Sequence, residues 1–176
     1  ARALDVGAFG VMVPMVEAAE EARRIVEATH YPPVGRRGAA LGVAQDDYSG
    51  GDVRAKIAAL NARTLVIAQI ESERGMAHLE AIAATPGIDV LWLGLFDLTN
   101  FLGIPGEFES PKYLDAVNAI VAAARRHGKG LGFMAADATW AERYRKLGFN
   151  MIAAGLDSSL LQAAIRTTLA PLKEIR

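Results

Sequence analysis

The sequence predicts an α/β fold in one domain over residues 1–176, with about five strands, as either a (β/α)8 TIM barrel or a doubly wound sheet. Short apolar runs alternate with amphipathic stretches of helical period, an order typical of a parallel sheet covered by helices. Several runs are continuously apolar, as strands buried on both faces are. None is followed directly by a G-x-G-x-x-G turn, which disfavours the alternative, a doubly wound nucleotide-binding sheet.

The chain begins with residues of helical character, which Gly7 is suited to terminate. A continuous apolar run over 9–16 predicts the first strand. Residues 17–29 repeat apolar positions at helical spacing and carry glutamates in the first turns, where the helix dipole favours acids. These residues therefore predict the first complete strand–helix unit.

The segment 30–52 is rich in Pro and Gly and has little periodicity, so we expect a long loop. Loops longer than ~15 residues in a compact domain are usually functional or mobile. The remaining elements follow in order: a short helix over 53–61, a strand in 65–72, a helix capped by Ser72, a strand over 89–98, a helix starting at Pro111 after the cap Ser110 and ending before Gly128, a strand over 130–136, a helix between Asp137 and Gly148, a strand over 149–157, and a last helix over about 158–173.

Composition excludes several classes of partner and chemistry. The 19 basic and 20 acidic residues nearly cancel, which gives no electrostatic basis for binding nucleic acid or an anionic membrane. No apolar run reaches the ~18 residues of a membrane span. There is no Cys, which excludes disulfides and thiolate chemistry and fits a reducing compartment, so we expect a cytoplasmic protein.

An acid follows the buried strand within LVIAQIES, residues 65–72. The two-residue period of a strand places Leu65, Ile67, Gln69 and Glu71 on one face. If that face points into a barrel, the two aliphatic side chains fill its interior. The amide and the carboxylate then reach the mouth, where barrel ligands bind.

The next predicted strand, DVLWLGLFDL, also ends in an acid. The same alternation aligns Leu91, Leu93, Leu95 and Asp97 on one face. Because neighbouring parallel strands lie ~4.8 Å apart, both carboxylates would reach one point on the rim.

Two carboxylates at one buried rim repel each other unless a cation neutralises them. A hard divalent ion such as Mg²⁺ or Mn²⁺ takes such oxygen ligands together with water and substrate oxygens. The pair therefore favours a metal site. Taken singly, Glu71 also fits an acid in the first turn of a helix, and Asp97 fits a loop cap.

The chain resembles the HpcH/HpaI aldolase family along essentially its whole length, in ALDVGAFGVMVPMVEAAEEAR, YPPVGRRG, AQIES, GLFDLTNFLGIPG and GKGLGFMAA. These are metal-dependent class II pyruvate aldolases on a (β/α)8 barrel. The resemblance implies reversible aldol cleavage of a 4-hydroxy-2-oxo acid to pyruvate and an aldehyde. It implies that Glu71 and Asp97 bind Mg²⁺ or Mn²⁺, with Co²⁺ as a further candidate. Gln69 and the backbone near Phe96 would hold the pyruvate moiety, and Leu95, Phe96 and the 36–50 loop would shape the aldehyde side.

The chain departs from the family pattern in two places. The family commonly has Pro and a small residue where this chain has Leu95 and Phe96, so we expect a reshaped pocket. The family's first strands, which carry the catalytic His with its acid partner and an Arg for the pyruvate carboxylate, have no match. Since a complete barrel runs to ~250 residues, we expect this chain to be N-terminally truncated, with the base upstream of Ala1.

Other interpretations stay open. One is a citrate-lyase-like acyl-CoA lyase of the same superfamily, and another is a non-catalytic metal-binding fragment. The resemblance also implies a homo-oligomer.

Overall fold

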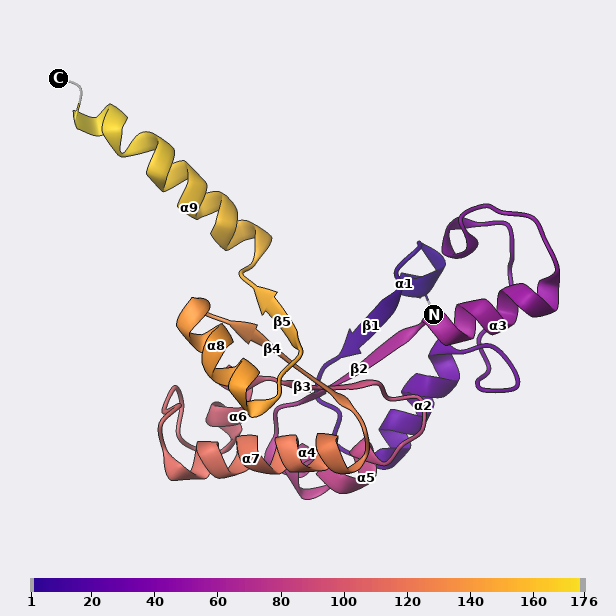
Figure 1. Cartoon of the computed structure of the whole chain (residues 1–176), viewed down its shortest axis with the longest axis horizontal. Coiled ribbons are helices and arrows are strands. Elements are labelled where there is room, and N and C mark those ends of the chain that lie inside the picture. Colours follow the sequence, from indigo (N-terminus) through magenta and orange to yellow (C-terminus); the bar gives the residue numbers. More distant parts are fainter. Residues whose placement is uncertain (1, 175–176) are drawn as a thin grey trace.

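The computed structural model describes residues 2–174 and shows an open half-barrel built on one parallel sheet (Figure 1). The strands are β1 (Gly10–Val13), β2 (Leu65–Ile70), β3 (Val90–Leu93), β4 (Gly130–Ala135) and β5 (Met151–Ala154). They pair in chain order, each parallel to the next. A doubly wound sheet reverses its strand order at a switch point, and this sheet has no reversal within the described residues. The predicted parallel, barrel-like sheet is confirmed, whereas the expected truncation stays a prediction.

Helices connect the strands, and most of those before α9 cover one face of the sheet (Figure 1). They are α1 (Arg2–Asp5), α2 (Ala19–Thr29), α3 (Val53–Arg63), α4 (Glu73–Ala77), α5 (Leu79–Ala83), α6 (Leu95–Phe101), α7 (Pro111–Arg126), α8 (Ala138–Leu147) and α9 (Asp157–Leu169). Two 3-10 turns, η1 (Ala44–Asp46) and η2 (Pro171–Glu174), complete the chain.

The two faces of the sheet carry different sets of side chains. On the helix side, Val66, Ile70, Leu91 and Phe133 pack with apolar residues of the covering helices in the main core. Burial of each such side chain contributes about 1.5–3 kcal/mol. On the other face, Ile67, Val90 and Trp92 form a second cluster with partly buried neighbours from β2, β4 and β5. No described helix contributes to this second cluster, so it marks the barrel interior.

Trp92 is the largest side chain on the interior face, and a glycine makes room for it. Trp92 lies opposite Gly132 in the β3–β4 register. A Cβ at Gly132 would overlap the indole ring, with Trp92 Cζ3 only 2.9 Å away. Trp92 therefore packs over the backbone of the neighbouring strand β4.

Predicted helix boundaries agree with the structure where a cap defines them. The side chains of Ser72, Ser110 and Asp137 each accept a hydrogen bond from a backbone N–H of the following first turn. Gly148 takes the left-handed conformation at the end of α8, with φ of 110°. Such polar and glycine caps satisfy backbone groups that a helix end leaves unpaired.

The predicted strand over 89–98 is wrong in its second half. β3 ends at Leu93, Gly94 is the N-cap of α6, and residues 95–101 are helical. The apolar spacing of this segment fits both a strand and a short helix, and only Gly94 marks the boundary. The predicted helix after Ser72 is also divided, at His78, into α4 and α5.

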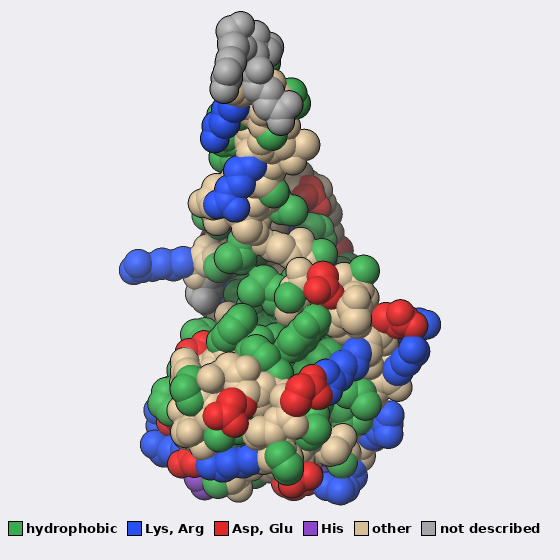
Figure 2. All heavy atoms as spheres, turned by 90° about the vertical axis from the view of Figure 1, so that its left-hand side faces the viewer, with side chains coloured by type: hydrophobic (Ala, Val, Ile, Leu, Met, Phe, Trp, Pro, Cys, Tyr) green, Lys and Arg blue, Asp and Glu red, His purple; other side chains and the backbone are tan. Residues whose placement is uncertain are grey.

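The last helix extends away from the sheet (Figure 1). None of the described residues of α9 is buried, and its apolar side chains Leu160, Leu161 and Ile165 are exposed. From the side facing α9, hydrophobic side chains gather in a hollow below it (Figure 2). Among the helices described in residues 2–174, none combines the length and apolarity needed to cross a membrane.

Candidate metal and substrate site

Glu71 lies directly beyond β2, at the carboxyl end of the sheet, and its side chain is only 3% exposed. The backbone N–H of Met15 donates to Glu71 Oε1 over 2.8 Å. The side-chain amide of Gln69 donates to the other carboxylate oxygen. Both oxygens are thus held in place, as the strand alternation of Gln69 and Glu71 predicts.

Met15 reaches this position through an unusual backbone conformation. It has φ of 53°, in the left-handed region that disfavours residues with a Cβ. The next residue, Val16, donates its N–H to the carbonyl of Gln69 over 3.2 Å, which fixes the chain beside the end of β2. Such strain persists where surrounding contacts enforce it, often at functional sites. Here it directs a donor at Glu71.

Gly94 brings the next strand end against the same carboxylate. Its N–H donates to the carbonyl of Ile70 over 3.2 Å. A Cβ at Gly94 would collide with the side chain of Glu71 and lie 2.8 Å from Gln69 Nε2. Only glycine allows this approach without displacing the two polar side chains.

Asp97 lies in the first turn of α6 and is exposed. The predicted shared face with Leu91 and Leu93 is wrong, because both leucines pack in the helix-side core. Asp97 instead reaches the rim because the chain turns at Gly94 into a helix. It approaches Glu71 closely enough for the two carboxyl groups to interact. The structure thus brings together the two acids, by a route that the alternation did not predict.

Burial raises the pKa of Glu71 above its ordinary value of 4.5. The donors from Met15 and Gln69 act in the opposite direction, since they stabilise the ionised form. The neighbouring carboxylate of Asp97 adds to the rise by like-charge repulsion. A buried acid beside a second acid is an arrangement that a bound cation relieves.

The two carboxylates suit a metal that takes few protein ligands. Within residues 2–174, no group of three or more His, Cys, Asp or Glu side chains is arranged around a common point. Mg²⁺ commonly uses one or two carboxylates and completes its shell with water and substrate oxygens. The donor set of Glu71 and Asp97 fits such an ion, and the exposure of Asp97 leaves the other positions open.

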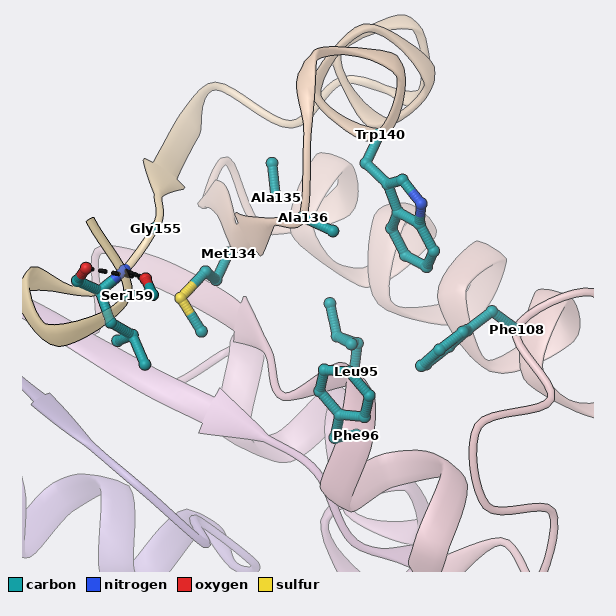
Figure 3. A pocket seen from close by; sticks show the side chains of 10 residues that line it. Leu95, Phe96, Phe108, Met134, Ala135, Ala136, Trp140, Gly155 and Ser159 are labelled. Atoms are coloured by element: carbon teal, nitrogen blue, oxygen red, sulfur yellow. Dashed lines mark hydrogen bonds between the residues drawn. The ribbon is translucent and has the colours of Figure 1, made fainter. Parts of the chain in front are cut away.

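An apolar cavity of about 320 Å³ opens at the carboxyl ends of β3, β4 and β5, and Phe96, the neighbour of Asp97 in the chain, lines it (Figure 3). Its lining comes from the start of α6, the loop before α7, the end of β4, α8 and the start of α9: Leu95, Phe96, Phe108, Met134, Trp140 and Ser159, with small residues between them. The predicted substrate residues Leu95 and Phe96 thus form the side of the cavity nearest to Asp97.

The predicted contribution of the 36–50 loop to the same chain's pocket is wrong. This loop lies at the amino-terminal ends of the strands, beside α1 and α3 (Figure 1). Gly7, before β1, has its nearest neighbours in Ala44, and Arg63, before β2, donates to the carbonyl of Gln45. The loop is therefore at the opposite end of the sheet from Glu71.

Four contributors were not predicted from the sequence. Met15 acts through its backbone, so its side chain carries no signal. Gly94 carries a weak signal, a glycine between a strand and an acid. Phe108 and Trp140 have the aromatic character of core residues, and only the fold shows that they line a cavity.

The sequence matches the HpcH/HpaI aldolase/citrate lyase family over residues 1–164. It is 35% identical to a 2-keto-3-deoxy-L-rhamnonate aldolase of Salmonella dublin, over 98% of this chain and 64% of the relative. It is 38% identical to a hydroxypyruvate/pyruvate aldolase of Chromohalobacter salexigens, over 97% of this chain and 66% of the relative. The crystal structure of an HpcH/HpaI aldolase from Desulfitobacterium hafniense DCB-2 superposes with a TM-score of 0.90 at 32% identity, covering 99% of this chain and 68% of that one. The chain thus spans about two thirds of the length of these proteins.

Proposed function

Because the chain belongs to the HpcH/HpaI aldolase/citrate lyase family, we propose that it forms the metal- and pyruvate-binding part of a carbon–carbon lyase. The reaction is the reversible cleavage of a 4-hydroxy-2-oxo acid to pyruvate and an aldehyde. One observation carries the proposal: the buried Glu71, held by two hydrogen bonds, faces Asp97 at the carboxyl end of a half-barrel.

Glu71 and Asp97 would hold a divalent ion, Mg²⁺ or Mn²⁺, whose oxygen-ligand preference matches them. When bound, such an ion supplies Lewis-acid stabilisation of the negative charge that develops on the 2-oxo group. Gln69 and Met15 keep the Glu71 carboxylate in one orientation. This fixed orientation avoids reorganisation during the reaction.

The residues around Phe96 would position the pyruvate moiety. The chain passes directly against Glu71 at Gly94 and then lines the apolar cavity with Leu95 and Phe96. Gln69 would orient the same moiety from β2. The C3–C4 bond breaks, the electron pair stays on C3, and a general base takes the proton of the 4-hydroxyl. We assign that base, and an Arg for the carboxylate, to residues before Ala1.

We also propose that the protein works as a cytoplasmic homo-oligomer. Within the described residues, α9 exposes the apolar side chains Leu160, Leu161 and Ile165. Exposed apolar surface of this kind favours association. Light scattering of the purified protein is expected to show more than one copy, and a stable monomer at micromolar concentration would contradict this part of the proposal.

The activity is tested by measuring pyruvate released from a 4-hydroxy-2-oxo acid, with lactate dehydrogenase and NADH as the coupled readout. Chelation is expected to abolish release, and added Mg²⁺ or Mn²⁺ to restore it. Release that persists at full rate after exhaustive chelation would refute the metal-dependent mechanism. Cleavage of an acyl-CoA substrate instead would indicate the citrate-lyase-like activity.

A further inference from the structure

The apolar cavity has an aromatic wall. The rings of Phe96 and Phe108 lie edge to face, with centroids 5.3 Å apart, and those of Phe108 and Trp140 likewise at 5.1 Å. The indole of Trp140 stacks in turn on Tyr144 in the core, at 5.7 Å. Phe108 and Trp140 are thus anchored by packing, whereas Phe96 is 62% exposed.

Polar side-chain groups in the lining are few: the hydroxyl of Ser159 and the indole N–H of Trp140. The only hydroxyl group among the described lining residues is that of Ser159, which accepts from the N–H of Leu156 over 3.0 Å and donates to its carbonyl over 2.8 Å (Figure 3). No charged side chain belongs to the lining that the structure describes. A ligand rich in hydroxyls, or one with a carboxylate, would lose its water here and gain few partners.

The size and place of the cavity suit the aldehyde end of a substrate. Its volume of about 320 Å³ is twice the ~150 Å³ that suffices for benzene in an engineered apolar cavity. Phe96 lines the cavity and directly precedes Asp97, so a 2-oxo acid held at the acids would extend its C4 substituent along this wall. An aromatic substituent would add edge-to-face contacts with rings already in that geometry.

We propose that the aldehyde taken and released by this enzyme is apolar and aromatic, so that the substrate is a 4-aryl-4-hydroxy-2-oxo acid. This inference deepens the proposed function and rests on it. The bond changes are those given above: C3–C4 breaks, the 4-hydroxyl loses its proton to the base, and the aryl aldehyde leaves from the cavity.

The test is aldol addition of pyruvate by the metal-loaded, full-length protein to benzaldehyde, glyceraldehyde and succinic semialdehyde. We expect kcat/KM for benzaldehyde to exceed the other two at least tenfold, a ratio typical of discrimination by an apolar pocket. Phe108→Ala and Trp140→Ala are each expected to lower the ratio of kcat/KM for benzaldehyde to kcat/KM for the other two aldehydes at least tenfold. Phe101→Ala, which removes an exposed ring of α6 outside the cavity, is expected to leave it unchanged.

Exchange of the pyruvate methyl protons for deuterium separates this inference from the proposed function, because the exchange needs no aldehyde. If the exchange occurs but the protein uses the polar aldehydes as well as or better than benzaldehyde, the inference is overturned and the proposed function stands. The same holds if both cavity variants leave the kcat/KM ratio between benzaldehyde and the polar aldehydes unchanged. Loss of exchange in a variant shows misfolding, and the milder Trp140→Leu then replaces it. Absence of exchange in the unmodified protein would refute the proposed function.

Fluorine NMR with 4-fluorobenzyl alcohol then tests the cavity by itself. We expect 4-fluorobenzyl alcohol to bind, and Trp140→Ala to weaken this binding at least tenfold. That result supports an aromatic subsite, because the substitution removes the indole against which the ring of the ligand would pack. No binding, as when another copy of the chain fills the cavity, overturns the inference.

Discussion

The rim of the half-barrel has two halves that meet at Gly94. Over β1 to β3, polar groups are fixed by hydrogen bonds: the carboxylate of Glu71 receives donors from Met15 and Gln69. Over β3 to β5, the cavity lining that the structure describes is apolar, and its one hydroxyl is satisfied locally. The first half is built for a charge in a defined position, whereas the second is built for shape.

The two halves also tolerate change differently. A charged site depends on a few donors at fixed distances, so one displaced atom disables it. An apolar wall depends on summed contacts, so single substitutions there change affinity gradually. Substitutions in the polar half are thus expected to remove activity, and those in the apolar half to change which aldehyde is used.

The largest effect is expected from Glu71→Gln. Lewis-acid stabilisation amounts to several kcal/mol and each ~1.4 kcal/mol is tenfold in rate, so kcat is expected to fall about a thousandfold. Glu73→Gln makes the same charge change two residues later, on an exposed side chain, and is expected to leave kcat within a factor of two. Equal losses in both variants would argue against a specific role for Glu71. Steady-state pyruvate release measures both.

Gly94→Ala tests the boundary between the halves. The added methyl group would displace Glu71 and Gln69, so we expect weaker metal binding and about a hundredfold loss in kcat/KM. Gly38→Ala is the control, because no atom lies within 4 Å of a Cβ there. Isothermal titration with Mn²⁺ measures the binding. Unchanged Mn²⁺ affinity would show that the acids do not share one ion.

The sequence predicted the polar half better than the apolar half, for a physical reason. Glu71 and Gln69 follow a regular strand, whose period assigns them to one face. Asp97 was assigned correctly to the rim, but the strand expected to carry it is a helix, since β3 ends four residues earlier. The aromatic wall joins Phe96, Phe108 and Trp140 from separate elements, and no local pattern indicates a cavity between them.

The pH dependence of the metal-free protein is expected to show the cost of burying Glu71. Its pKa is raised in the fold, so the folded state binds the proton more tightly than the unfolded state. Stability from this group is present below pH ~4.5 and is lost as pH rises through the folded pKa. Thermal melts should therefore show Glu71→Gln gaining stability over the unmodified protein as pH rises above ~4.5, with no difference at the acid end. Mn²⁺ should raise the melting temperature of the unmodified protein only.

The smallest effect is expected from Met15→Gly, which separates the strain at the polar half from its hydrogen bond. Glycine takes φ of 53° without the Cβ penalty of about 1 kcal/mol and keeps the N–H that donates to Glu71. We expect nearly unchanged kcat and a melting temperature higher by about 2–4 °C. Tyr48→Gly, at φ of 54° on the loop far from the acids, is the matched control and should stabilise the protein similarly. Loss of activity in Met15→Gly alone would mean that the methionine side chain, and not its backbone, serves the site.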